Sequence, residues 1–268
     1  DTDTDTDTDT DTDTDTDTDT DTDTDTDTDT DTDPKEPCEG VAICDDFEAE
    51  TAGDPPNVAN WEVVTPNCSG DGVVSVDTST SHSGDMSVKV TSSGGYCNHI
   101  FIAPTASVSS IGSTLYGRFW VRFGQTFGWE HITFLAMKDS IEDRDLRMGG
   151  QSQVMMWNRE SDDATLPELS PTGIGLSWAP PVNSWHCVQF VVEVDSGTLK
   201  TWVDEDLIEG LVVDGESTPD VDSQWLRKTD WRPQLVDAKF GWEGYGGGAS
   251  EVWFDDIALD SQPIECAL

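Results

Sequence analysis

The stretch "LYGRFWVRF" (residues 115–123) alternates between apolar and polar side chains. Phe119, Val121 and Phe123 fall on one side, whereas Arg118 and Arg122 fall on the other, together with two aromatic rings. Successive side chains of a β-strand point to opposite faces of its sheet, so this period of two predicts a strand with one buried face. The second face of that sheet carries arginines and rings.

A second stretch, "LRMGGQSQVMMW" (residues 146–157), has the same character when it is interpreted as one strand. Four of its side chains then share a face: Arg147, Gln151, Gln153 and Trp157. The run between the two stretches places His131 on its polar side. If these three strands are neighbours in one sheet, their polar faces form a surface lined with hydrogen-bond donors and rings, which is typical of a ligand cleft.

The remaining chain repeats this pattern. From Val41 onward, fourteen short runs rich in Val, Ile, Phe and Trp lie between clusters of Gly, Asp, Ser and Pro, and helical periodicity never persists for three turns. Fourteen strands are more than one twisted sheet packs well. The sequence therefore predicts one all-β domain over residues 38–268, an antiparallel sandwich of two sheets.

Residues 1–32 are sixteen repeats of Asp-Thr. Such a run has no apolar surface to bury and its carboxylates repel one another, so we expect a disordered acidic stalk over residues 1–37. O-glycosylation of its threonines and loose calcium binding both stay open as further roles. The net charge is −42, and because seventeen of the acids lie in residues 1–33, the rest of the chain is itself acidic. This charge argues against nucleic acid as a partner.

Six cysteines, with no CxxC pair and no His/Cys cluster at zinc spacing, favour disulfides over a metal site. No apolar run is long enough to span a bilayer. We therefore expect a secreted or cell-surface protein, monomeric, from which a signal peptide has been removed, with a lipid anchor upstream of the chain as one option. Six cysteines allow fifteen pairings. One of these pairings joins Cys38 to Cys44, Cys68 to Cys97 and Cys187 to Cys266.

The arginines are unevenly distributed. Five of the seven lie within residues 118–159, in a domain that is otherwise acidic. Arginine's planar fork suits carboxylate recognition, so the clustering predicts a cationic groove for a carboxylate-bearing ligand. The alternative is that these arginines, Arg144 and Arg159 above all, pair with neighbouring acids on a solvated surface.

Three stretches together resemble a known family: "ICDDFEAE" (residues 43–50), "TSHSGDMSVKV" (residues 80–90) and "EVWFDDIALD" (residues 251–260). They are similar to the concanavalin A-like jelly rolls of polysaccharide lyase-like proteins, whose relatives include a fungal cellulose-induced protein, glucuronan lyase and alginate lyase. The likeness covers most of residues 38–266. It implies a jelly-roll sandwich that interacts with polysaccharide.

The resemblance also implies a structural calcium site. In such sandwiches the first and last strands are neighbours, which would bring Glu48 near Asp255 and near the turn that contains Ser81 and Gly84. Carboxylate and carbonyl oxygens are the ligands that calcium prefers. The alternative is that the acids around Asp255 are ordinary strand-end residues.

For chemistry, the resemblance implies β-elimination of a uronic-acid polysaccharide. Arg118 and Gln151 would bind the uronate carboxylate, with Arg147 or Gln153 assisting. His131 would be the base and Tyr245 the acid. Further substrate contacts would come from Trp157, Lys239 and Trp242. Lys239 matches the lysine of the alginate-lyase "KxG" strand, but Glu243 stands where that family has its tyrosine, which weakens the assignment of the acid.

Three other classes of function compete with the lyase. A glycosidase needs paired carboxylates on one strand face, and the nearest string, Glu193-Val194-Asp195, lacks the third acid of the usual pattern. A non-catalytic lectin-like module would use the same cleft, with Trp157, Trp178, Trp242 and Tyr245 gripping sugar rings. The sequence leaves lyase and lectin open. A purely structural surface protein would leave the arginine cluster unexplained.

Overall fold

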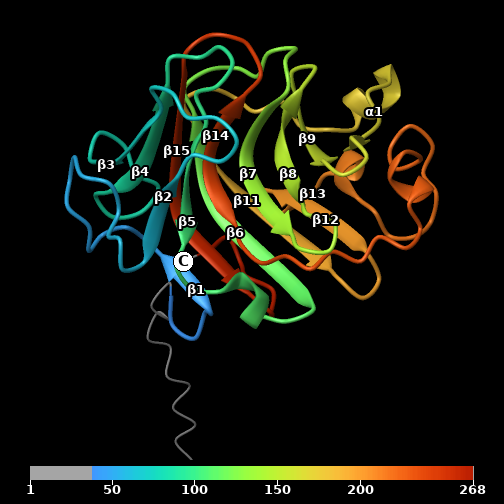
Figure 1. The fold of residues 1–268 in the computed structure, drawn as a ribbon, viewed down its shortest axis with the longest axis horizontal. Helices are drawn as coiled ribbons and strands as arrows, with labels where there is room; N and C mark the ends of the chain where they lie inside the picture. The colour runs from blue at the N-terminus through green and yellow to red at the C-terminus, as the bar shows by residue number, and fades with distance from the viewer. Residues whose placement is uncertain (1–37, 268) are drawn as a thin grey trace, which may run out of the picture. The chain divides into compact units, whose positions relative to one another are not determined.

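The computed structural model describes residues 38–267, so the predicted stalk over residues 1–37 lies outside the described part of the chain. The described residues form two antiparallel sheets that face each other (Figure 1). Sheet A has eight strands, in the order β13 (Asp206–Leu207), β12 (Thr198–Val203), β11 (Trp185–Glu193), β6 (Thr114–Phe123), β15 (Ser250–Asp260), β4 (Ser87–Ser92) and β3 (Val73–Asp77), with β1 (Ile43–Asp45) also paired to β15.

Sheet B has seven strands. Their order is β10 (Ala164–Leu166), β9 (Val154–Arg159), β8 (Arg144–Gln151), β7 (Ile132–Asp139), β14 (Lys239–Gly244), β5 (Ile100–Pro104) and β2 (Trp61–Val64). This arrangement confirms the predicted all-β sandwich. It also confirms that the first and last strands are neighbours, because Ile43 of β1 pairs with Leu259 of β15.

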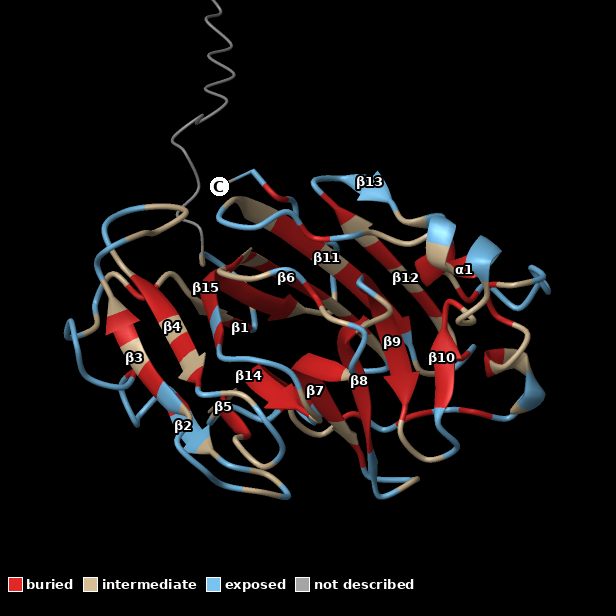
Figure 2. Ribbon diagram, turned by 90° about the horizontal axis from the view of Figure 1, so that it is seen from above, coloured by how far each residue is buried: buried red, intermediate tan, exposed pale blue. Residues whose placement is uncertain are grey.

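The core lies between the two sheets, where the buried faces of the strands meet (Figure 2). Phe119 of β6 is fully buried, and its ring lies 5.4 Å from that of Phe240 in β14 and 6.3 Å from that of Phe134 in β7, centroid to centroid. Edge-on aromatic pairs at these separations add to the free energy that their burial contributes. The alternation of residues 115–123 therefore predicts correctly which side chains of β6 face the core.

The interpretation of residues 146–157 as one strand is wrong. The stretch forms two strands, β8 and β9, joined by a turn at Ser152 and Gln153, whose φ angles are +53° and +70°. A two-residue turn of this kind reverses the chain and starts a new alternation. Met148 and Trp157 are paired across the hairpin and both face the core, so Trp157 does not share the face of Arg147 and Gln151.

The described residues contain little helix. One of the fourteen runs, residues 173–177, predicts a strand, but residues 171–175 form the short helix α1 (Pro171–Gly175). Ser170 caps its first turn by accepting the Gly173 amide, and Pro171 starts it. The 3-10 turns are η1 (Val108–Ser110), η2 (Glu209–Leu211) and η3 (Trp225–Arg227). Within residues 38–267 none of the helices is long and apolar enough to cross a membrane.

Three disulfides hold peripheral segments to the sandwich. They join Cys38 to Cys44, Cys68 to Cys97 and Cys187 to Cys266, which confirms the proposed pairing. The third links β11 to the C-terminal segment across 79 residues of sequence. Within this segment, the backbone carbonyl of Ile264 accepts a hydrogen bond from the side-chain amide of Gln189 at 2.6 Å.

Candidate functional site

The outer face of sheet B carries a connected group of polar side chains. Phe240 and Met148 point into the core, so the residues that alternate with them point outward. Two cross-strand rows result. Lys239, Ala136, Arg147 and Asn158 form the first row, and Glu243, Thr133 and Gly149 form the second.

Glu243 is the centre of this group and is almost completely buried. Its carboxylate accepts a hydrogen bond from the Tyr245 hydroxyl at 2.5 Å and lies 3.6 Å from Arg147 and 3.5 Å from the ring of His99. Arg147 also pairs with Glu160 at 2.7 Å. The resulting network fixes the orientation of the Tyr245 ring and of the Arg147 guanidinium.

His131, for which the resemblance implies the role of base, lies beside Tyr245, for which it implies the role of acid. Their rings stack with centroids 5.8 Å apart, and the His131 carbonyl accepts the Tyr245 amide. The ladder pairs Ile132 with Gly150, so the next position along it brings His131 opposite Gln151. Burial, with the nearby positive charge of Arg147, lowers the pKa of His131. Burial and the hydrogen bond to Glu243 raise the pKa of the Tyr245 hydroxyl.

Several buried polar atoms of this face have no hydrogen-bond partner among residues 38–267. They are Nε2 of His131, Oγ1 of Thr133 and Nε of Arg147. Leaving such groups unpaired costs about 1–3 kcal/mol each, so a ligand or water that reaches them recovers that free energy. Their gathering around the His131–Tyr245 pair makes this face the best candidate for a binding site.

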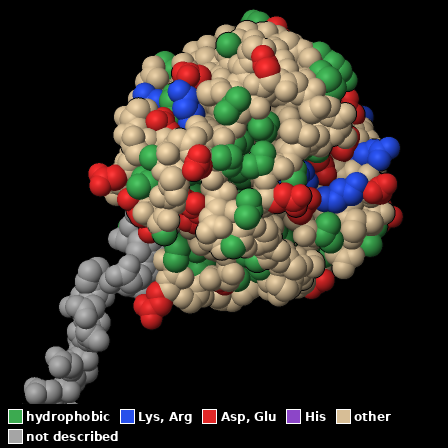
Figure 3. Space-filling view, turned by 60° about the vertical axis from the view of Figure 1, so that its left-hand side comes forward, with side chains coloured by type: hydrophobic (Ala, Val, Ile, Leu, Met, Phe, Trp, Pro, Cys, Tyr) green, Lys and Arg blue, Asp and Glu red, His purple; other side chains and the backbone are tan. Residues whose placement is uncertain are grey.

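A groove of about 550 Å³ adjoins the group. Its charged lining has five acids and three cations: Glu62, Asp143, Asp145, Glu160, Asp237, Lys138, Arg144 and Lys239. Lys239 pairs with Asp237 at 2.7 Å, and Lys138 pairs with Asp143 at the same distance. The surface shows the same intermingling of basic and acidic side chains (Figure 3).

The predicted cationic groove is therefore wrong, because acids outnumber cations in the groove and three of the arginines contact neighbouring side chains. Arg147 pairs with Glu160, and Arg159 makes two hydrogen bonds with Asp162 at 2.7–2.8 Å. Arg122 lies over the ring of Trp253, 4.6 Å from its centroid. Arg147 and Arg159 thus follow the alternative interpretation, in which the arginines pair with neighbouring acids and do not form a cationic groove.

Arg118 does not lie with His131 and Gln151. It belongs to β6 of sheet A and is buried on that sheet's outer face, where its charge interacts with Asp256 and Asp255. The prediction of one groove shared by Arg118, His131 and Gln151 is therefore wrong for Arg118. The physical reason is that β6 pairs with β11 and β15, whereas the strands of the other two residues belong to sheet B.

The remaining predicted contacts divide between surface and core. Lys239 lies on the outer face of sheet B, and Gln153 is exposed in the β8–β9 turn. Trp157 and Trp242 are buried members of the core, and the indole nitrogen of Trp157 donates to Thr201 at 2.8 Å. The two indoles are therefore unavailable to a sugar.

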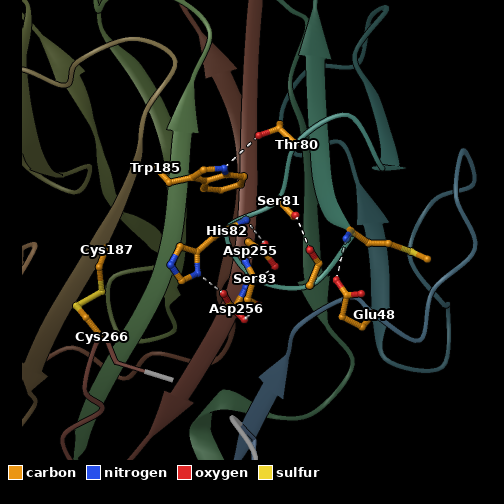
Figure 4. Close-up of polar contacts among 12 residues, drawn as sticks. Glu48, Thr80, Ser81, His82, Ser83, Trp185, Cys187, Asp255, Asp256 and Cys266 are labelled. Carbon is orange, nitrogen blue, oxygen red and sulfur yellow. Dashed lines mark hydrogen bonds and ion pairs between the residues drawn. A yellow bond between two sulfur atoms is a disulfide. The ribbon is translucent and has the colours of Figure 1, made fainter.

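The residues predicted to bind calcium meet at the loop before β4 (Figure 4). The Glu48 carboxylate accepts the amides of Asp85 and Met86 at 2.9 and 2.8 Å, and the Ser81 hydroxyl donates to the Gly84 carbonyl at 3.0 Å. Asp255 accepts the His82 amide at 2.7 Å. Gly84 has φ +53°, which favours glycine, and a Cβ there would lie 2.3 Å from the Glu48 carboxyl carbon and displace that side chain.

The buried position of Asp255 disfavours the charged form of its carboxyl. Burial and the adjacent Asp256 raise its pKa to about 8. An oxygen-binding cation beside this carboxyl would favour its charged form. In the described part of the chain, however, no three His, Cys, Asp or Glu side chains are arranged to hold a metal ion, and the predicted set includes only two carboxylates.

Three residues of the network were not assigned a role from sequence: Glu243, Glu160 and His99. In the sequence, Glu243 stands out only as a departure from the "KxG" pattern. Its position two residues before Tyr245 was the available signal, because alternate residues of a strand share a face. Glu160 and His99 come from β9's end and from the residue before β5, and no local pattern links them to β14.

The pH dependence of stability should reveal the environment of His131. A lowered folded-state pKa means that the unfolded chain binds more protons below about pH 6.5, so this contribution to stability is lost as the pH falls through that value. We expect the free energy of unfolding, measured in urea at pH 7.5 and 5.5, to fall more in the wild type than in His131→Asn. Equal losses in the two proteins would contradict this account.

Comparison with known proteins identifies the family of this domain. The model of the family described as polysaccharide lyase-like, Cip1-like core domain, matches residues 46–262. The solved structure of cellulose induced protein Cip1 is 38% identical, with a TM-score of 0.76, and the match covers 84% of this chain and 100% of that one.

A more distant structure is that of endo-β-1,4-glucuronan lyase from the fungus Trichoderma reesei. It is 14% identical with a TM-score of 0.52, covers 79% of this chain and 96% of its own, and supports the fold alone. No curated protein sequence matches. With a family model over most of its length and a relative 38% identical across its whole domain, the chain belongs to the Cip1-like family of polysaccharide lyase-like proteins.

Proposed function

We propose that this domain binds an extracellular polysaccharide on the outer face of sheet B and cleaves a uronate-containing chain by β-elimination. The observation that supports this most is the His131–Tyr245 pair, whose pKa values are displaced in opposite directions. A histidine with a lowered pKa is neutral near pH 7 and can accept a proton. A tyrosine with a raised pKa keeps its proton and can donate it.

In this mechanism His131 removes the C5 proton of the uronate, and the electron pair forms the C4–C5 double bond as the C4–oxygen bond breaks. Tyr245 protonates the leaving oxygen. Gln151 and Arg147 bind the C6 carboxylate and so make the C5 proton more acidic. Arg147 binds the uronate carboxylate in place of Arg118, for which the resemblance implies this role. To do so, Arg147 must release its ion pair with Glu160 or Glu243.

The reaction can be tested with glucuronan, alginate and ulvan, because each cleavage creates an unsaturated uronate that absorbs in the ultraviolet. We expect the absorbance to rise with one of these polymers. Binding to all three without a rise in absorbance would refute the lyase.

A second candidate is a lectin-like module that binds without cleaving. The acidic excess of the adjoining groove and the two carboxylates around Arg147 favour it, because both disfavour an anionic polymer. Under this alternative, neutral β-1,4-glucan fragments bind more tightly than uronate fragments, and calorimetric titration with both would show the order of affinity.

We propose an extracellular location and a structural role for calcium. The three disulfides support the location, since such bonds persist in oxidising compartments. Glu48, Ser81, Gly84 and Asp255 would supply the calcium ligands, and the metal would fix the loop before β4 to β15 and to the segment after β1.

Calcium should raise the melting temperature of chelator-treated protein by about 5–10 °C. A ligand at a hundred times its Kd stabilises by about 2.7 kcal/mol, and each kcal/mol shifts the melting temperature by about 2–4 °C in a domain of this size. The shift should disappear in Glu48→Gln and Asp255→Asn but persist in Asp85→Asn, which alters an exposed carboxylate of the same loop. An unchanged melting temperature with calcium would remove the site.

A further inference from the structure

Exposed aromatic side chains are rare in this domain. Among the large hydrophobic residues that residues 38–267 leave exposed, the only aromatic ones are Tyr96 and Trp129, each with 69% of its surface accessible. Isolated exposed aliphatic residues are ordinary on a protein surface. A tyrosine and a tryptophan this open are unusual, because each leaves a large apolar area in water.

Both residues lie beside the His131–Tyr245 pair, although 33 positions separate them in sequence. Tyr96 forms an isolated β-bridge with Tyr245, and their rings lie 5.5 Å apart. Trp129 precedes His131 by two residues. The intervening Glu130 packs against the loop after Tyr245, because its Cγ lies 3.1 Å from the point where a Cβ on Gly246 would stand. The open ring of Tyr96 therefore lies against the proposed acid, and Trp129 lies two residues before the proposed base.

The buried indoles cannot contact a polysaccharide from solvent. Trp157 and Trp242 lie in the core, and Trp178 packs against it. The ring of His99 also contacts Tyr245, at 5.5 Å between centroids, but it is buried. Tyr96 and Trp129 are thus the rings at this site that a polymer can reach from solvent.

We propose that Tyr96 and Trp129 are stacking platforms for the pyranose rings on either side of the bond to be cleaved. This inference rests on the proposed function and adds a substrate class to it. In β-1,4-linked chains of gluco configuration all ring substituents are equatorial, so both faces of each sugar present only axial C–H groups to an aromatic ring. Mannuronate and guluronate carry axial oxygens that interrupt such a face. The geometry therefore favours β-1,4-glucuronan over alginate.

The test measures binding and cleavage separately. Affinity for glucuronan fragments, cello-oligosaccharides and alginate fragments is determined by calorimetric titration, and cleavage by the absorbance of the unsaturated product. We expect Trp129→Ala and Tyr96→Ala each to weaken binding of gluco-configured fragments about threefold to tenfold. Trp129→Phe and Tyr96→Phe, which keep a ring, should remain within about twofold of the wild type. Leu207→Ala, an exposed apolar residue on the edge of sheet A, is the matched control.

The outcomes separate this proposal from the proposed reaction. Binding that depends on the two rings without any cleavage would overturn the lyase and support the platforms. Cleavage that is unchanged in both alanine variants, or tighter binding of alginate than of glucuronan, would overturn the platforms alone. Absence of both binding and cleavage would overturn both. A change in oligomeric state of Trp129→Ala, measured by sedimentation, would show that the ring serves a protein contact instead.

Discussion

Tyr245→Phe is expected to lower kcat on the cleaved polymer by about 10²- to 10⁴-fold. Tyr245→Phe keeps the ring that contacts His131 and Tyr96 and loses only the hydroxyl that donates the proton. His131→Ala should cause a loss of similar size, because the base is then absent. Initial rates of absorbance increase at saturating polymer give both values.

The controls use the same residue types on the other sheet. Tyr116→Phe alters a hydroxyl in a groove on sheet A, and His186→Ala removes a ring that pairs with Asp204. Both should keep kcat within about twofold of the wild type. If Tyr245→Phe retained full activity, proton donation would have to come from another group, and the assignment of the acid would be wrong.

Trp157→Ala is expected to lower the free energy of unfolding by about 3–5 kcal/mol. The side chain is fully buried, contacts Phe190 across the core and donates its indole hydrogen to Thr201. Its removal leaves a cavity and an unpaired hydroxyl, and both effects are destabilising. Urea unfolding measures the loss.

Trp129→Ala is the comparison, because it removes the same side chain from the surface. We expect its stability to change by less than about 1 kcal/mol. If Trp157→Ala were instead stable and no longer bound polysaccharide, Trp157 would be a substrate contact, as the resemblance implies.

The alternation of residues 115–123 correctly predicts which side chains of β6 face the core. It does not predict which strands lie beside β6, because a period of two determines the face of a residue and carries no information on pairing. The strands on either side of the turn at residues 124–131 belong to different sheets, so Arg118 and His131 lie on opposite faces of the sandwich. The convergence of His131, Gln151 and Tyr245 could be anticipated because of the family resemblance.

Two further features could not be predicted from sequence. The β8–β9 turn contains Ser152 and Gln153 at positive φ, without the Asn-Gly or Gly pair that signals a tight hairpin, so the run was interpreted as continuous. Tyr96 and Trp129 lie in loops, where no periodicity indicates which side chains are exposed. The contact of Tyr96 with Tyr245 depends on how the loop around Tyr96 pairs with the end of β14.

The disulfide between Cys187 and Cys266 has a practical consequence for measuring affinity. Cys187 and Gln189 both point away from the core of sheet A, and the last residues of the chain are fastened to them. A tag added after residue 268 would therefore emerge from the side of the sandwich remote from His131 and Tyr245. A sensor chip or bead that captures such a tag would leave the polysaccharide-facing surface free to the solution, provided that no reductant is present to release the anchor.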